Sequence, residues 1–317
     1  MNQAPKISVI MCAYNEERHI DEAIQSILKQ SFSDFEFIIV DDCSTDKTSQ
    51  IIKRYKDQDQ RIIVLTNENN LGLAGSKNRA LGIAKGKYIA IMDADDISLP
   101  ERLQLEYNYL ESHPDIFLVG SSLIILDDKD KEVNRTKPPC TPEAIARELP
   151  KNNFMAQNTI LFRRQPGIKY RKNMCIVEDY DFYLRLLTDN KKLANLSEPL
   201  VKYRLTSESV SLAKRPQQAL LRDMAKNFYW QRVKTGHDEY DCFDSDSIIN
   251  IDLENSTDKF ILKELISASF RINDFNKVRL YCKKFFHHYG IFNKTLIYYL
   301  ASFLPKSIVN LRRKISS

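Results

Sequence analysis

The sequence predicts an α/β fold in which a mostly parallel sheet is flanked by helices and followed by a helical C-terminal region. Short apolar runs rich in Ile and Val alternate with stretches of helical periodicity through the first 130 residues. This alternation is typical of βαβ units whose strands are buried on both faces. The parallel-strand pattern stops before residue 215, so we expect an α/β domain over residues 1–214. Residues 215–317 are expected to be mostly helical, with a basic amphipathic tail.

Four short apolar runs are the predicted parallel strands, with helices between them. The runs cover residues 7–13, 35–40, 62–65 and 88–92. The stretch from Ile20 to Leu28 repeats its apolar residues at helical spacing. After the fourth run, Ser98 to Glu101 can form a capping box that begins another helix, and residues 117–126 have the composition of a further strand.

The composition is that of a globular chain with enough apolar residues for a large core. Of its 317 residues, 43% are hydrophobic and 28% are charged, which suits one large domain and a smaller one. The first residues have no signal-peptide pattern, and the six cysteines include no Cys-x-x-Cys pair. The cysteine spacing argues against a zinc site and a disulfide framework, and it predicts a cytoplasmic location.

Acidic side chains follow two of the predicted strands, at the edge where an open α/β sheet binds its ligands. Asp41 and Asp42 end the second strand, and Asp93, Asp95 and Asp96 follow the fourth. Carboxylates this close together repel each other unless a cation or hydrogen bonds offset their charge. Mg²⁺ and Mn²⁺ prefer such oxygen ligands and complete their coordination with water and phosphate oxygens.

A short acidic motif does not by itself establish a metal site. Asp93-x-Asp95 is also compatible with a polar turn in which Asp96 and Ser98 cap the next helix. Gly72–Gly75 lacks the Gly-x-Gly-x-x-Gly spacing, and no Gly-Lys-Ser/Thr follows it. A P-loop NTPase and an ordinary NAD enzyme are therefore disfavoured, and a metal is expected to neutralise the phosphates of the ligand.

Six short motifs occur in a characteristic order along the first hundred residues. They are Ile7–Glu16 (ISVIMCAYNE), Val40–Asp46 (VDDCSTD), Asn70–Gly72 (NLG), Lys77–Ala80 (KNRA), Gly86–Ala90 (GKYIA) and Met92–Asp96 (MDADD). Their order and spacing resemble the family 2 inverting glycosyltransferases, and the resemblance covers roughly residues 5–212. It implies the A-type nucleotide-sugar-binding fold for the α/β domain.

The resemblance implies a donor-binding role for residues after the first two strands. Tyr14 and Asp42 match positions that hold the base of the nucleotide by stacking and hydrogen bonding. Cys12 lies where a contact to the base is usual, and Asn15 belongs to the same donor-binding motif. Lys77 lies in a segment that often lines the donor pocket. Alternatively, Lys77 is a solvated lysine on the face of a helix.

The resemblance also assigns the metal and the base. Asp93 matches a position near the donor ribose and the metal, and Asp95 matches the carboxylate that coordinates Mn²⁺ or Mg²⁺. Val177–Leu186 resembles the Glu-Asp motif of the family, with Asp179 at the catalytic base. An acceptor hydroxyl is a poor nucleophile until a positioned group takes its proton. Taken alone, Glu178-Asp179 is more typical of the acidic first turn of a helix, which the helix dipole favours.

Two motifs depart from the family pattern. The segment around Tyr203–Ser211 has Thr206 where the family usually has a His that can contact the metal or the diphosphate. Gln157-Asn158 replaces a frequent His-Pro near the place where acceptors bind. The first departure raises the question of whether this loop provides a metal ligand, and the second weakens any inference about the acceptor.

The last segment is basic and amphipathic. Residues 275–317 contain nine Lys and Arg and no Asp or Glu. Its apolar side chains recur at helical spacing at Leu296, Leu300, Phe303 and Leu304, and again at Ile308, Leu311 and Ile315. This pattern predicts a segment that lies on an anionic membrane surface; the alternative is a helical cap packed on the α/β domain. No DNA- or RNA-binding motif accompanies the basic residues, so no nucleic-acid partner is expected.

These observations predict a metal-dependent glycosyltransferase that moves a hexosyl or N-acetylhexosaminyl group from a nucleotide sugar, expected to be a UDP-sugar, to an acceptor hydroxyl with inversion. The expected acceptor is a saccharide or a lipid-linked saccharide of bacterial polysaccharide or glycolipid biosynthesis. Peripheral association with the inner face of the cell membrane is expected. The alternatives are a nucleotidyltransferase on a related sheet and a non-catalytic nucleotide-sugar-binding protein.

Overall fold

The computed structural model describes residues 4–205, 215–250, 252, 255–271, 274–291 and 293–304. Thr206 and the tail residues from Pro305 onward, including Ile308, Leu311 and Ile315, lie outside the described residues, and so do the expectations attached to them. Within the described ranges, no helix is both long and apolar enough to cross a bilayer.

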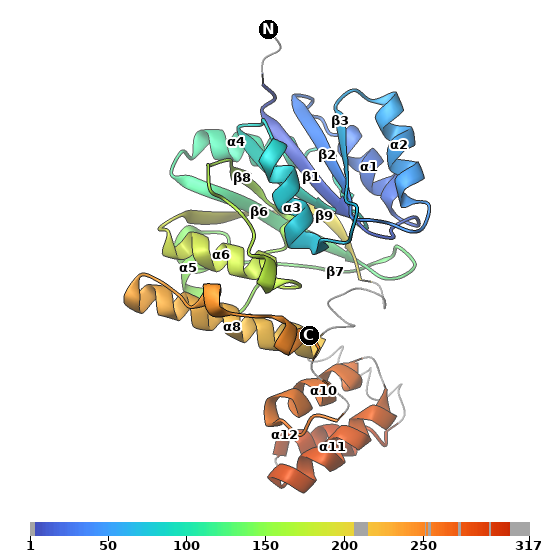
Figure 1. Ribbon diagram of the computed structural model, residues 1–317, viewed down its shortest axis with the longest axis vertical. Helices are drawn as coiled ribbons and strands as arrows, with labels where there is room; N and C mark the ends of the chain where they lie inside the picture. Colours follow the sequence, from blue (N-terminus) through green and yellow to red (C-terminus); the bar gives the residue numbers. More distant parts are fainter. Residues whose placement is uncertain are drawn as a thin grey trace. The chain divides into compact units, whose positions relative to one another are not determined.

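A nine-stranded sheet forms the centre of the α/β part (Figure 1). In sheet order the strands are β3 (Ile62–Thr66), β2 (Phe35–Asp41), β1 (Ile7–Ala13), β4 (Tyr88–Asp93), β8 (Leu161–Arg163), β6 (Ile116–Leu126), β9 (Lys192–Arg204) and β5 (Ile97–Ser98), with β7 (Glu132–Arg135) paired to β6. The pairings place β3, β2, β1, β4, β6 and β9 in one direction and β5, β7 and β8 in the other. The predicted α/β fold with a mostly parallel sheet is therefore confirmed, and its antiparallel strands make it a mixed sheet.

The first strands present their two faces to different helices. Helices α1 (Ile20–Leu28), α2 (Thr48–Gln58) and α4 (Arg102–Ser112) share one apolar core with the odd-numbered residues of β1, such as Val9 and Met11. Because side chains alternate along a strand, the even-numbered residues point to the opposite face. There they meet α3 (Gly72–Ile83), which Figure 1 shows in front of the sheet.

One glycine allows the close approach of two strands. The backbone N–H of Gly86 donates to Ser8 Oγ at 2.8 Å, just before β4 begins. A Cβ atom at residue 86 would lie 2.4 Å from the Ser8 nitrogen, so a larger residue cannot take this place without moving β1. The glycine of the fifth motif is therefore explained by packing between β1 and β4.

The expected capping box before α4 is wrong. Helix α4 begins at Arg102, and its N-cap residue Glu101 makes no side-chain capping hydrogen bond. Ser98 instead pairs with Val201 in the short strand β5, and its hydroxyl accepts a hydrogen bond from Gln30 at 3.1 Å. Pairing with a strand about a hundred residues farther on therefore places Ser98 in a strand, although the local sequence pattern predicted a helix cap there.

Further helices lie between and after the last strands of the sheet. They are α5 (Pro142–Glu148), η1 (Gln157–Thr159), η2 (Lys172–Met174), α6 (Glu178–Thr188), α8 (Arg215–Thr235), η3 (Tyr240–Cys242) and α9 (Asp246–Ile249). The chain divides into two compact units, one of residues 1–206 and 224–243 and the other of residues 207–223 and 244–317. The boundary expected between residues 214 and 215 falls inside the first segment of the second unit.

Residues 224–243 are tied to the α/β unit by a shared carboxylate. Asp238 accepts hydrogen bonds from both terminal nitrogens of Arg171, at 2.8 and 3.1 Å, and also pairs with Arg232. The side chain of Asp238 is 5% exposed, and those of Arg171 and Arg232 are 17% and 9% exposed. A buried carboxylate that loses a partner, or a buried cation that loses its carboxylate, carries a large desolvation penalty.

We expect Asp238→Ala to lower the free energy of unfolding by about 3 kcal/mol, because two poorly solvated guanidinium groups would lose their shared counterion. Urea denaturation followed by the fluorescence of Trp230, the single tryptophan of the chain, measures this loss. Asp241→Ala is the control, since Asp241 is exposed three residues farther on. Equal losses for the two variants would contradict the prediction.

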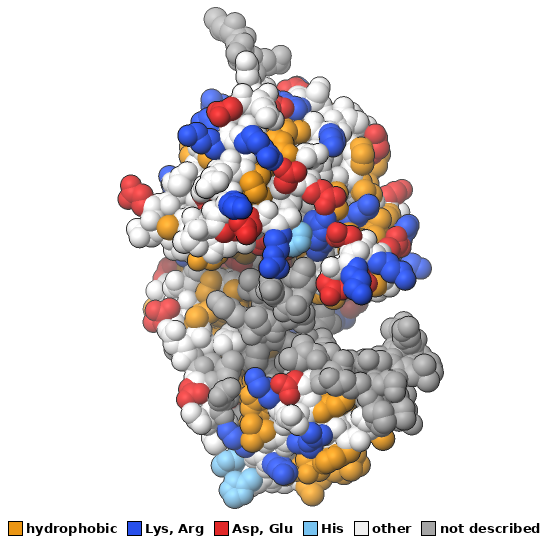
Figure 2. Space-filling model, turned by 90° about the vertical axis from the view of Figure 1, so that its right-hand side faces the viewer, with side chains coloured by type: hydrophobic (Ala, Val, Ile, Leu, Met, Phe, Trp, Pro, Cys, Tyr) orange, Lys and Arg blue, Asp and Glu red, His pale blue; other side chains and the backbone are white. Residues whose placement is uncertain are grey.

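The second unit is helical, as the sequence predicts. Helices α10 (Lys259–Arg271), α11 (Phe275–Tyr289) and α12 (Asn293–Ala301) surround a small apolar core. Asp274 caps α11 by accepting the N–H of Lys277 at 3.1 Å, and Gly290, with φ of 75°, ends it. On the face seen in Figure 2, hydrophobic and basic side chains lie next to one another over this unit.

Candidate active site

The carboxyl ends of the first four strands converge on one edge, as parallel strands require. Cys12 of β1 is the register partner of Asp93 of β4, and Ala13 is the partner of Asp41 of β2. Cys12 is buried and carries an electrostatic interaction with Lys77 of α3. Burial raises the pKa of the Cys12 thiol to about 12, so the thiol is neutral. The predicted site residues of β1, β2, β4 and α3 therefore belong to one neighbourhood.

Asp42 is held by donors from the next strand and loop. Its Oδ1 accepts hydrogen bonds from Asn67 Nδ2 at 2.6 Å and from the backbone N–H of Leu71 at 2.8 Å. Asn67 also donates to Ser76 Oγ at 2.8 Å and accepts from Arg79. Asp42 and Asn67 are 4% and 2% exposed, so buried hydrogen bonds hold this carboxylate in one orientation.

Asn15 braces two loops of the site. Its backbone adopts a positive φ of 56°, a conformation that Asn tolerates better than most residues. The side-chain oxygen accepts the backbone N–H of Thr45 at 2.8 Å, and the Asn15 N–H donates to Ser44 Oγ at 3.1 Å. Tyr14, the preceding residue, leaves 48% of its surface exposed at the rim of the site. A direct contact of Asn15 or Tyr14 with the donor stays a prediction.

Lys77 lies at the centre of a buried polar cluster. Its Nζ donates to Glu178 Oε1 at 2.8 Å and to Gln157 Oε1, and it lies 5.5 Å from the centroid of the Tyr170 ring. The Lys77 and Glu178 side chains are only 2% and 4% exposed. Burial alone lowers the pKa of this ammonium, but the charges of Glu178 and Asp93 outweigh that effect and raise it. The alternative of a solvated helix-face lysine is therefore wrong.

Asp179 is a half-buried carboxylate next to Glu178 in the chain. Its Oδ2 accepts a hydrogen bond from Asn153 Nδ2 at 3.0 Å, and its Oδ1 accepts the backbone N–H of Tyr180 at 2.7 Å. Burial, followed by repulsion from Glu178, raises its pKa to about 6 against the attraction of Lys77. A carboxylate with this pKa is ionised near neutral pH and still basic enough to take a proton.

The acidic turn after β4 is anchored by Arg204 at the end of β9. Arg204 Nη1 donates to the Asp95 carbonyl oxygen at 2.7 Å, and the Arg204 N–H donates to Asp96 Oδ1 at 2.8 Å. Asp96 also accepts from Asn158 and is fully buried. Burial raises the pKa of Asp96, and the charges of Asp95 and Asp93 raise it further. Asp96 thus holds the turn, which leaves Asp93 and Asp95 as the carboxylates that can meet a ligand.

Asp93 and Asp95 form an acidic pair that suits a divalent cation. Burial raises the pKa of Asp93 to about 6 against the attraction of Lys77, and repulsion from Asp95 adds to the rise. Burial also raises the pKa of Asp95. In the described part of the chain no three His, Cys, Asp or Glu side chains are placed to hold a metal together. The donor set therefore fits a cation that takes one or two carboxylates and completes its coordination with phosphate oxygens and water.

Several residues of this cluster were not identified from the sequence. Asn67 directly follows β3, so the rule that pointed to the ends of the other strands could have found it. No comparable local signal marks Asn153, Tyr170 and Arg204. Each of them reaches the site through a contact with a residue far away in sequence. Gln157 was noticed only as a departure from the family pattern.

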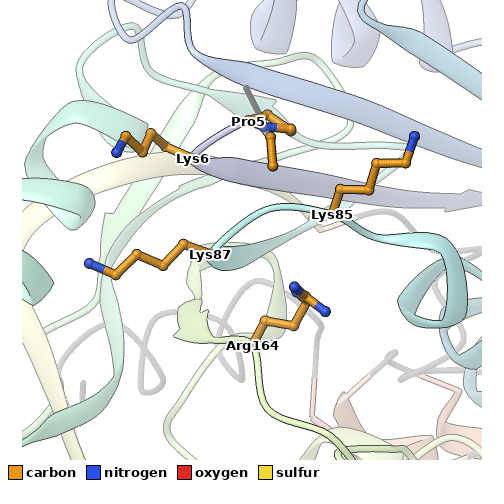
Figure 3. Close-up of a pocket in the computed structure, with 6 residues that line it drawn as sticks. Pro5, Lys6, Lys85, Lys87 and Arg164 are labelled. Carbon is orange, nitrogen blue, oxygen red and sulfur yellow. The ribbon is translucent and has the colours of Figure 1, made fainter. Parts of the chain in front are cut away.

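A basic hollow at the opposite edge of the sheet does not belong to this site. It is lined by Ala4, Pro5, Lys6, Lys85, Lys87 and Arg164. Lys6 and Lys87 immediately precede β1 and β4, whereas the acidic residues follow these strands. In Figure 3 the ammonium groups of Lys6 and Lys85 point to opposite sides of the hollow, so its cations do not converge on one point.

Comparison with known sequences identifies the family of the α/β part. The model of glycosyl transferase family 2 matches residues 8–171. An uncharacterized glycosyltransferase of Methanocaldococcus jannaschii is 35% identical over 235 residues, which are 73% of this chain and 81% of that protein. The Escherichia coli UDP-Glc:alpha-D-GlcNAc-diphosphoundecaprenol beta-1,3-glucosyltransferase WfgD is 32% identical over 206 residues, 65% of this chain and 79% of that protein.

Solved structures share the fold at lower sequence identity. S. aureus TarS 1-349 in complex with UDP-GlcNAc has a TM-score of 0.56 at 20% identity and covers 90% of this chain and 89% of that one. The mannosyltransferase PcManGT from Pyrobaculum calidifontis, in complex with GDP-Man and Mn²⁺, has a TM-score of 0.57 at 15% identity and covers 98% and 88%. The chain spans 54% of the longer TarS chain. The fold is thus the A-type glycosyltransferase fold, and the chain belongs to glycosyl transferase family 2.

Proposed function

We propose that this glycosyltransferase moves a sugar from a UDP-sugar to an acceptor hydroxyl, with inversion and with the help of a divalent metal ion. The observation that carries the proposal is the electrostatic link between Asp179 and the donor edge. Lys77 donates a hydrogen bond to Glu178, the residue before Asp179, and its charge also acts on Asp179, Asp93 and Cys12, which supports grouping the proposed base with the proposed donor-binding residues.

The donor is proposed to bind across the ends of β1, β2 and β4. The exposed ring of Tyr14 can stack on the base, and Cys12 and Asn15 lie in the same strand end and loop. Both described hydrogen bonds to the Asp42 carboxylate use Oδ1, which leaves Oδ2 to accept an N–H of the base. Uracil offers such an N–H at N3, as thymine and guanine do with a ring N–H of their own, and the preference for UDP is supported by the TarS structure, which contains UDP-GlcNAc.

The base step is proposed for Asp179. Its ionised carboxylate takes the proton of the acceptor hydroxyl while the oxygen of that hydroxyl attacks the anomeric carbon. Attack on the side opposite the diphosphate forms the new carbon–oxygen bond as the bond to the diphosphate breaks, so the anomeric centre inverts. Asn153 and the N–H of Tyr180 hold the carboxylate in place by hydrogen bonds of 3.0 and 2.7 Å.

The residues proposed to hold Mn²⁺ or Mg²⁺ are Asp95 and, next to it, Asp93. When bound, such an ion neutralises the charge that develops on the departing diphosphate. Arg204 fixes the backbone of the acidic turn through the Asp95 carbonyl oxygen, which keeps the Asp95 carboxylate in position. Lys77 has three N–H donors, and its bonds to Glu178 and Gln157 leave one for the donor or its diphosphate.

The acceptor is proposed to be a saccharide or a lipid-linked saccharide of bacterial polysaccharide or glycolipid biosynthesis. The support is the similarity to WfgD, whose printed name includes a sugar linked to diphosphoundecaprenol. Transfer of a hexosyl or N-acetylhexosaminyl group is in keeping with the donors named for WfgD and TarS. The expected location at the inner face of the cell membrane remains a prediction of the same kind.

A donor panel tests the proposal. UDP-, GDP- and dTDP-sugars are incubated with the enzyme and Mn²⁺ or EDTA, and release of each nucleoside diphosphate is measured with and without saccharide acceptors. We expect UDP release that EDTA abolishes, and we expect Asp95→Asn to lower it by about 10²-fold or more, because that variant loses a charged metal ligand. Asp115→Asn is the control and should keep full activity, because Asp115 is exposed just before β6, at the edge of the sheet opposite the acidic residues.

Other products of the panel would favour the alternatives. Formation of pyrophosphate from a sugar phosphate and a nucleoside triphosphate would identify a nucleotidyltransferase. Binding of a nucleotide sugar with no turnover in the presence of any acceptor would favour a non-catalytic nucleotide-sugar-binding protein. Absence of binding to every donor would refute the proposal.

A further inference from the structure

Helix α12 and the residues after it bury one side and expose the other. Thr295 is buried, and its carbonyl oxygen accepts a hydrogen bond from Cys282 Sγ at 3.6 Å. Tyr298 and Tyr299 pack against the core of the helical unit. The outer side consists of Ile297, Leu300, Phe303 and Leu304, which are 64%, 58%, 60% and 41% exposed. Ile297, Leu300 and Leu304 follow the spacing of three and four residues that places side chains on one face of a helix. A cluster of large exposed apolar side chains of this kind is typical of a surface that binds a protein, a membrane or another ligand.

Arg279 of α11 lies beside this apolar face. The Arg279 guanidinium is 5.0 Å from the centroid of the Phe303 ring, and its Nη1 donates to the Ser302 carbonyl oxygen at 2.7 Å. Lys277 and Lys283 are exposed on the same helix. From residue 275 to the last residue of the sequence there is no Asp or Glu. The face therefore combines exposed apolar side chains with positive charge that no carboxylate of the same segment offsets.

The sequence directly after the apolar face is also basic and has no acidic residue. Residues 305–317 follow Leu304 and add Lys306, Arg312, Arg313 and Lys314, again with no acidic residue. An anionic lipid surface is the partner that matches both properties, because apolar side chains enter the headgroup region while Lys and Arg meet the phosphates. A protein partner would have to supply an acidic and an apolar surface together, and nothing in the chain indicates one.

We propose that the face formed by Ile297, Leu300, Phe303 and Leu304, with Arg279 beside it, docks on an anionic lipid surface. The binding is peripheral and reversible, since it uses a few apolar side chains and the cation beside them. Docking of this kind does not depend on the identity of the sugar donor. Its use in bringing the enzyme to a lipid-linked acceptor rests on the proposed function.

Sedimentation with vesicles tests the docking surface. The full chain is mixed with vesicles of phosphatidylcholine alone or with 30% phosphatidylglycerol, and the bound fraction is measured at low and high salt. We expect binding to the anionic vesicles only, weakened by salt because the charge contribution is screened. The double variant Leu300→Ser, Phe303→Ser should bind at least about tenfold more weakly, because it loses two apolar insertions. The pair Lys277→Gln, Lys283→Gln should also bind more weakly, by up to about 25-fold, since each lost charge weakens binding by about fivefold.

A matched control and a second readout make the result decisive. Leu105→Ser, Val133→Ser removes two exposed apolar side chains from the α/β unit and should bind vesicles like the wild type. The proposal is overturned if the wild type does not sediment with anionic vesicles, or if the α12 variant binds as well as the control. It is also overturned if light scattering shows that the same face mediates self-association instead. Donor turnover in vesicle-free buffer is measured in parallel, so that its failure in every variant counts against the proposed function and not against docking.

Discussion

Asp179→Asn is expected to lower kcat by about 10³-fold, within the range measured for the loss of a general base. The amide has nearly the shape of the carboxylate and can keep the hydrogen bond from the Tyr180 N–H, but it cannot take the proton of the acceptor hydroxyl. The donor does not need this group in order to bind, so its Kd should stay within about twofold of the wild-type value. Initial rates of transfer and calorimetric titration with the donor measure the two quantities.

The control for this variant lies at the other end of the same helix. Asp189 follows the last residue of α6, is exposed, and occupies the C-cap position. Asp189→Asn should therefore leave kcat unchanged. If Asp179→Asn retained more than a tenth of wild-type kcat, another group would have to be the base. If it lost donor binding together with kcat, Asp179 would belong to the donor site.

The pH dependence follows from the same carboxyl group. Burial and the charge of Glu178 raise its pKa to about 6, above the ordinary value for Asp. Because the base works in its ionised form, kcat/KM should be constant above pH 7 and fall as the pH drops through 6. At pH 5 it should be about tenfold below the plateau, since one pKa unit corresponds to a factor of ten in the ionised fraction. Asp179→Asn should have lost this limb of the profile.

The fold could largely be predicted because the buried parallel strands have a clear signal in the sequence, namely short runs of apolar residues. Buried parallel strands such as β1 (ISVIMCA) and β2 (FEFIIVD) consist mostly of apolar residues, and every one of their residues is buried. Their ends were predicted within a residue, and so was the acidic edge after β4. The two-residue strand β5 could not be foreseen, because pairing with β9, about a hundred residues farther on, creates it. The capping box was wrong for the same reason.

The candidate site was predicted less completely, and the gaps have one cause. Each motif points to a residue type at a place in the chain, but the charge environment of a side chain depends on partners that the motif does not contain. Asp238 meets Arg171 across 67 residues, and no local pattern links them. Lys77 is the strongest case, because its environment decided between a solvated and a buried residue, and Glu178 lies 101 residues away.

The Lys77–Glu178 pair should contribute to both stability and catalysis. Both side chains are almost fully buried, so removing one partner leaves the other charge without compensation in a poorly solvated place. Lys77 also holds down the pKa of Asp179 and of Asp93, although burial raises both. Loss of the ammonium group therefore has two separable consequences, one for the free energy of unfolding and one for the protonation of the proposed base.

Lys77→Met is expected to lower the free energy of unfolding by about 3 kcal/mol, the size typical of a broken buried ion pair. The acidic limb of kcat/KM should also move to higher pH, because the pKa of Asp179 rises once the positive charge is gone. Urea denaturation and the pH–rate profile measure the two effects. Lys85→Met, an exposed lysine just beyond the end of α3, is the control and should change neither. Adding Glu178→Gln to Lys77→Met should recover part of the stability, since no buried charge is then left unpaired. A purely structural role for Lys77 would leave the limb where it is, whereas a solvated lysine would leave stability unchanged as well.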